Sequence, residues 1–115
     1  MSPTASRPPF ADAAVAAGGR FIVDARDVIE DVDAAACALI GYAPEEVIGL
    51  HGSELIPLEA HAATAVSLDR MRRGEIAHRA ARVRHKDGRV LAVEVTAQPL
   101  SDGRLILRLR PSPPS

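Results

Sequence analysis

The sequence predicts an α+β domain in which a five-stranded antiparallel sheet carries its helices on one face. Two strand-like stretches come first, at residues 20–25 and 28–32, and three more lie at residues 75–85, 90–100 and 104–110. Between these groups, residues 34–73 show helical periodicity. Strands from both ends of a chain can share one sheet when the helices between them cover a single face.

Composition fits one such domain. The 115 residues are 47% hydrophobic, but 21 of them are alanine, and Phe10, Phe21 and Tyr42 are the only aromatic residues. No apolar run approaches the ~20 residues of a membrane span, and no signal peptide opens the chain. The single cysteine, Cys37, cannot form an internal disulfide. We therefore expect a cytoplasmic protein with no membrane partner.

The net charge of −1 conceals two opposite halves. Residues 1–69 hold 11 acids and 3 bases, a balance of −8, whereas residues 70–115 hold 4 acids and 11 bases, a balance of +7. A basic half can bind nucleic acid. Here the bases alternate along strands, and no aromatic side chains stand among them to stack on nucleobases. We interpret the asymmetry as acidic helices facing a basic sheet or a sister subunit, with no nucleic acid partner.

The first 18 residues are expected to precede the main domain, which spans residues 19–110. Residues 1–9 are rich in Pro, Ser and Thr and are expected to be disordered. Residues 10–17 predict a short helix with Phe10 and Ala14 on one weakly apolar face. The alternative for this segment is a frayed tail.

Two short helices are predicted after the first strand pair. Asp33 is a candidate N-cap for a helix over residues 34–40, because its carboxylate can accept hydrogen bonds from free backbone N–H groups. Cys37 in this helix is expected to be buried and unreactive. Pro44 suits the first position of the next helix, and Gly49 can take the left-handed conformation that ends it.

A longer helix is predicted over residues 58–73. It follows a single turn that Ser53 is expected to cap and that ends before Pro57. Three- and four-residue steps place on one face of this helix the residues His61, Thr64, Ala65, Leu68, Met71 and Arg72.

Along the last three predicted strands, successive side chains alternate between the two faces of the sheet. Ala81 and Val83 share one face of the first, and residues 86–89 form a tight Asp-Gly hairpin turn. In the other two strands the inward residues are expected to be Leu91, Val93, Val95, Ala97, Leu105, Leu107 and Leu109. Residues 111–115 are expected to form a disordered tail that cannot extend the strand, because it begins with proline.

Several segments resemble the PAS domain family. The main one is GYAPEEVIG at residues 41–49, which is similar to the family's GYs-eEliG motif. Residues 21–33 resemble its opening hairpin, residues 34–40 its first helix, and the segments Gly74-Glu75 and His85-Lys86-Asp87-Gly88 its rrGe and rkDG punctuation. The resemblance runs from about residue 19 to residue 110 and implies a sensory or association module.

The resemblance also implies a space beneath the long helix, where family members hold haem, flavin, small organic acids or no ligand. We expect a small, largely apolar molecule there, with His61 or Thr64 as its polar handle. The candidate pocket residues are His61, Thr64, Ala65, Leu68, Met71, Val83, Leu91, Val93 and Leu107.

Haem and flavin are the two cofactors that the resemblance implies as other ligands. The haem-binding members place their ligand histidine near the position of Thr64, one turn after His61, so a hydrogen bond at the helix start is the expected role of His61 and haem ligation is the alternative. The Asn-Cys-Arg-Phe-Leu-Gln motif of the LOV photosensors is absent, so flavin photochemistry is not expected.

No catalytic motif is present. The sequence lacks G-x-S-x-G, Walker, HExxH and paired CxxC patterns, and neither Ser53 nor Ser67 has an evident base partner. We therefore expect neither enzymatic activity nor a metal site.

The resemblance implies a homodimer that belongs to a larger regulator, such as a histidine kinase, cyclase or transcription factor, whose effector domain is not in this chain. The alternative is a ligand-free scaffold for protein–protein interaction. Contacts with the second copy are expected from the leading helix and the outer sheet face, at Phe10, Ala14, Glu94, Thr96, Ile106 and Arg108.

Overall fold

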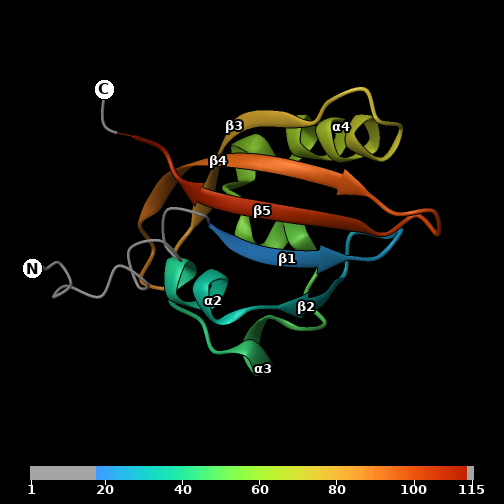
Figure 1. Ribbon diagram of the computed structural model, residues 1–115. Helices are drawn as coiled ribbons and strands as arrows, with labels where there is room; N and C mark the ends of the chain where they lie inside the picture. The colour runs from blue at the N-terminus through green and yellow to red at the C-terminus, as the bar shows by residue number, and fades with distance from the viewer. Residues whose placement is uncertain (1–17, 114–115) are drawn as a thin grey trace, which may run out of the picture.

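The computed structural model describes residues 18–113, which form one antiparallel sheet with its helices on one face (Figure 1). The predicted fold class is confirmed, and the helix expected at residues 10–17 lies outside the described residues. In chain order the elements are β1 (Gly19–Val23), β2 (Ile29–Val32), α2 (Ala34–Ile40), α3 (Pro44–Val47), η1 (Gly52–Leu55), η2 (Leu58–Ala60), α4 (His61–Arg72), β3 (His78–Arg84), β4 (Val90–Pro99) and β5 (Leu105–Pro111).

The strand order β2-β1-β5-β4-β3 joins the two ends of the domain at the centre of the sheet. β1 pairs with β5, and Phe21 lies opposite Leu107. Alternation along these strands is as predicted: Leu105 and Leu109 are buried, whereas Arg108 is exposed. The inner face therefore presents a continuous apolar surface to the helices.

The last strand is longer than the sequence suggests. β5 includes Pro111, which lies opposite Val93, and the next residue still bonds to β4 because Ser112 N donates to Ala92 O at 3.0 Å. The prediction that proline ends the strand is wrong. The described pairing of β1 with β5 starts at Gly19 opposite Leu109, two residues before Pro111, so the proline interrupts no described hydrogen bond between these strands.

Local capping fixes where the helices begin. Asp33 Oδ1 accepts from Ala36 N at 2.8 Å and from Arg20 N at 3.0 Å, which confirms the N-cap of α2 and ties it to β1. The cap of η1 was assigned to the wrong residue: the His51 side chain accepts from Ser53 N, so histidine and not Ser53 is the cap.

The long helix is interrupted near its start. η2 forms a separate 3-10 turn, and α4 then runs for 12 residues, of which only Ser67 and Met71 are buried. Among residues 18–113, no helix is both long enough and apolar enough to cross a bilayer.

Candidate ligand cavity beneath helix α4

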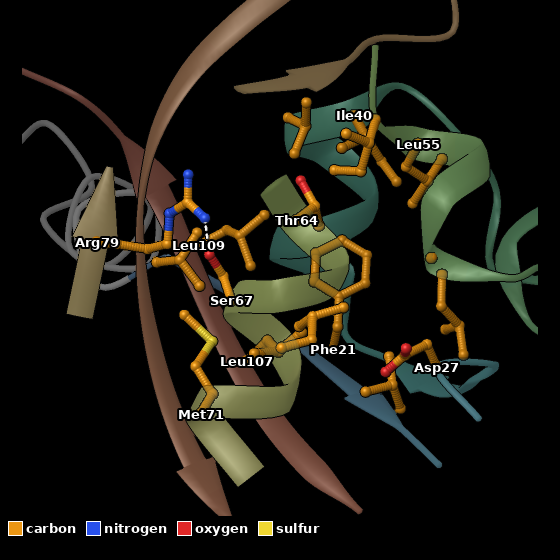
Figure 2. Close-up of a pocket in the computed structure, with 17 residues that line it drawn as sticks. Phe21, Asp27, Ile40, Leu55, Thr64, Ser67, Met71, Arg79, Leu107 and Leu109 are labelled. Carbon is orange, nitrogen blue, oxygen red and sulfur yellow. Dashed lines mark hydrogen bonds between the residues drawn. The ribbon is translucent and has the colours of Figure 1, made fainter. Parts of the chain in front are cut away.

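A cavity of about 90 Å³ lies between α4 and the inner face of the sheet (Figure 2). This is more space than a single water molecule requires. Four lining residues have polar side chains: Asp27, Thr64, Ser67 and Arg79. The remaining lining residues are Phe21, Val23, Ile29, Ile40, Gly52, Leu55, Ile56, Leu68, Met71, Val83, Val95, Leu107 and Leu109.

Five of the nine candidate pocket residues line this cavity: Thr64, Leu68, Met71, Val83 and Leu107. They come from one face of α4 and from two strands of the sheet, β3 and β5. Sequence periodicity therefore placed the cavity between the correct elements, although it did not identify the whole wall.

The other four candidates lie elsewhere. Ala65 is exposed, because α4 turns Ser67 and not Ala65 toward the sheet. Val93 is fully buried in the core outside the cavity wall, and Leu91 lines a separate pocket beside α2. The placement of these three residues at the cavity is corrected accordingly, and the fourth, His61, is described below.

Arg79 is the main feature of the cavity that sequence reasoning missed. Its partner in the sheet is Val95, so it lies on the inner face of β3 with Ala81 and Val83. Its Nη1 donates to Ser67 Oγ on α4 (Figure 2). Its Nε donates to Ala80 O at 2.9 Å. The available signal was the alternation of β3 itself, which gives residues 79, 81 and 83 one face.

An ion pair closes another part of the wall. Arg72, at the end of α4, donates to the Asp27 carboxylate, to Asp24 O at 2.6 Å and to Gly103 O at 2.8 Å. Both ion-pair side chains are mostly buried, at 18% and 19% exposure. Arg72 therefore fastens α4 both to the β1–β2 turn and to the β4–β5 turn.

His61 does not point into the cavity. Its Nε2 lies 2.9 Å from Ile56 O, and its ring borders a separate surface groove with Leu58 and Arg84. This is the expected hydrogen bond at the helix start. Among residues 18–113, no group of three or more His, Cys, Asp or Glu side chains is placed to hold a metal ion.

The cavity does not fit haem or flavin. Sites for drug-sized ligands and cofactors usually measure about 300–1,000 Å³, several times the 90 Å³ found here. Cys37 is buried in α2 and does not line the cavity. Burial, followed by the negative charges of Asp33 and Glu45, raises the pKa of the Cys37 thiol, which fits the expected unreactive cysteine.

Ser53 and Ser67 each have a side-chain partner. Ser53 Oγ lies 2.8 Å from His51 Nδ1, a partner that no catalytic motif in the sequence indicates. The same His51 nitrogen accepts from Ser53 N at 3.2 Å, which makes the contact part of the η1 cap. Ser67 Oγ accepts from Arg79 Nη1, and a guanidinium carries N–H donors but no acceptor, so it cannot serve as a base.

The residues expected at a dimer interface lie on the outer sheet face where they are described. Thr96 and Arg108 are exposed, and Ile106 is half-buried. Glu94 is engaged within the chain, because its Oε1 lies 2.7 Å from His78 Nε2. Phe10 and Ala14 lie outside the described residues.

Comparisons with known proteins identify the family. Residues 13–111 match the family profile described as the PAS fold, whereas curated proteins gave no match. A domain of a sensory box sensor histidine kinase/response regulator from Geobacter sulfurreducens is 29% identical with a TM-score of 0.72, and the alignment covers 95% of this chain and 97% of that one.

Two further solved structures share the fold. A PAS domain from Colwellia psychrerythraea is 18% identical over 90% of this chain and 95% of that chain, with a TM-score of 0.73. A LOV protein from Rhodobacter sphaeroides is 13% identical over 90% of this chain and 65% of that chain, with the same TM-score of 0.73. Because the family profile spans most of the sequence, the chain belongs to the PAS fold family.

Proposed function

We propose that this chain is the sensory module of a larger signalling protein and that it binds a small, mainly apolar molecule beneath α4. The observation that carries the proposal is a cavity of about 90 Å³ between α4 and the sheet, lined mainly by apolar side chains of the core. Membership of the PAS fold family and the likeness to a sensor histidine kinase domain support a role in signalling and not in catalysis.

The packing of α4 supports a mechanism in which ligand binding shifts a conformational equilibrium. Thr64 and Met71 of α4 face Leu107 of β5 across the cavity, so a ligand there touches both layers (Figure 2). A ligand that fits one arrangement of helix and sheet better than another increases the population of that arrangement. The Arg72 contacts would carry a movement of α4 to two turns at one end of the sheet.

We further propose that the module works as a homodimer through its outer sheet face. Figure 1 shows this face without helices over it in the described part of the chain, and Thr96 and Arg108 are exposed there. If the cavity takes no ligand, the alternative function is a dimerisation scaffold.

Native mass spectrometry of freshly purified protein tests the proposal. We expect additional non-covalent mass on the wild-type chain, and the loss of that mass in Thr64→Leu, which fills the cavity. The same substitution on the outer face, Thr96→Leu, is the control and should retain the additional mass. A stable dimer without additional mass would contradict ligand sensing and support the scaffold.

A further inference from the structure

We infer that residues 10–17 of this chain, which lie outside the described residues, pack into the pocket beside α2 within their own chain. This pocket is separate from the cavity beneath α4, and the interface would form whether or not that cavity takes a ligand.

The pocket beside α2 has mainly apolar walls and a volume of about 300 Å³. Part of its apolar wall is accessible to solvent: Leu39 and Leu91 are half-buried, and Ala38 and Pro111 are exposed. Removing such a surface from water is favourable, so the pocket suits an apolar occupant. Seven of its nine lining residues are apolar or glycine, namely Gly19, Ala35, Ala38, Leu39, Leu91, Leu109 and Pro111.

The two polar side chains of the pocket already have partners in the β3–β4 turn. Arg89 Nε donates to Asp87 Oδ2 at 2.7 Å, and His85 Nδ1 accepts from Asp87 N at 3.1 Å. Because Asp87 engages both side chains, the occupant needs no charged group to satisfy them. An apolar stretch of polypeptide meets this requirement.

The chain itself brings such a stretch to the pocket. Gly19 lines the pocket, and Gly18 before it lies so close to β5 that a Cβ at Gly18 would be 2.3 Å from Leu109 O. Gly18 is therefore the whole linker between the pocket and residues 10–17. Eight residues in a helix extend only about 12 Å. A segment on so short a tether has a high effective concentration at the pocket.

The sequence of this segment matches the pocket better than it matches the outer face of the sheet. Helical periodicity places Phe10 and Ala14 on one apolar face, and Asp12, its only charged residue, on the opposite one. The outer face at this end of β5 carries the exposed side chains of Arg108 and Arg110. Phe10 and Ala14 would therefore contact α2 and β4 of their own chain and not a second copy.

Hydrogen exchange of the full chain, measured by mass spectrometry, tests this interface. A helix of eight residues is marginal in water on its own, so slow exchange there reports docking. We expect exchange in residues 10–17 to be about tenfold slower than in a peptide of residues 1–17. Ala38→Gln places a longer polar side chain in the pocket and should restore the rate of the peptide. Ala34→Gln, at an exposed position of α2 outside the pocket, should leave the exchange slow.

A second pair of variants changes the segment and leaves the described fold intact, so it provides the test if Ala38→Gln does not fold. Phe10→Ser removes the largest apolar side chain of the segment and should also restore the rate of the peptide. Val15→Ser changes a residue outside the apolar face and should not. Far-UV circular dichroism checks that each variant is folded.

Three results would overturn the inference. The first is exchange in the wild type as fast as in the peptide. The second is slow exchange that Thr96→Gln on the outer face abolishes and Ala38→Gln does not, because the segment would then lie on the outer face. The third is protection that disappears on dilution, because the pocket would then hold the segment of a second copy.

Discussion

Helices α2 and α4 pack against the same sheet in opposite ways. The seven-residue α2 buries Ala36, Cys37 and Ile40 and begins at a side-chain cap. The 12-residue α4 buries only Ser67 and Met71 and has no side-chain N-cap. α2 therefore packs more of its length into the core than the longer helix does.

The close approach of α2 depends on the absence of a side chain on β1. A Cβ built at Gly19 would lie 2.2 Å from the Cα of Ala36, so α2 meets the sheet backbone to backbone. α4 is instead held at a distance by larger side chains, over the cavity, and its C-terminal end is fastened by Arg72. α2 is fixed by steric fit along its length, whereas α4 is held by Met71 and Leu68 in the core and by the polar contacts of Arg72. We expect local opening to cost less at α4 for this reason.

The largest expected effect comes from removing the close approach of α2. Gly19→Ala should lower the free energy of unfolding by about 3 kcal/mol, since the new methyl group collides with the backbone of Ala36. Urea denaturation measures the change. Gly52→Ala is the matched control, because its Cβ would meet only Asp27 O at an ordinary 3.5 Å, and it should change stability by no more than about 0.5 kcal/mol. Equal losses in the two variants would contradict the steric account of α2.

An intermediate effect is expected where α4 is fastened. Arg72→Gln removes the ion pair to Asp27 and weakens the contacts with Asp24 O and Gly103 O, so it should cost about 2 kcal/mol. Hydrogen exchange should accelerate in α4 and stay unchanged in α2. Arg70→Gln, on the same helix, loses only an exposed pair with Glu75 and should be nearly neutral. Faster exchange in both helices would show that they open together.

The smallest expected effect is a response to acid at the turn where Arg72 docks. Hydrogen bonds from Val28 N and Arg26 N hold the pKa of Asp24 below its usual value. A carboxylate with a lowered folded-state pKa stabilises the protein above its unfolded pKa of about 3.9, and this contribution is lost as the pH falls through the folded value.

Acidification from pH 6 to pH 3 should therefore accelerate hydrogen exchange in the β1–β2 turn and at the end of α4. Asp24→Asn should reduce that response, because the amide oxygen can still accept both hydrogen bonds and does not titrate in this range. An undiminished response in Asp24→Asn would assign the acid sensitivity to other carboxylates.

Much of the fold could be predicted because the sequence signals for it act between residues that are close together in the chain. The carboxylate of Asp33, the proline at the start of α3 and the alternation of β5 each act over a few residues. The prediction failed where a neighbouring element decided the outcome. Pro111 lies in β5 beyond the described β1–β5 pairing, which starts at Gly19 opposite Leu109, and nothing near residue 111 in the sequence encodes where that pairing starts.

In the cavity wall too, some residues could be predicted from local sequence and others depended on the packing of a neighbouring element. Thr64, Leu68 and Met71 were found from helical periodicity, but the rotation of α4 about its axis depends on what it packs against, so Ser67 was missed and Ala65 wrongly included. The two polar contacts of the wall join residues that are distant in sequence: Arg79 and Ser67 are 12 positions apart, and Arg72 and Asp27 are 45 apart.

The sequence alone determined the order, type and approximate limits of the described strands and helices, because hydrogen-bond caps, turns and side-chain periodicity operate between near neighbours in the chain. Only the tertiary structure decided that Arg79, which has no carboxylate partner among residues 18–113, lines a mainly apolar cavity. That outcome depends on the register of β3 with β4 and on the seating of α4, which the packing of the whole domain sets.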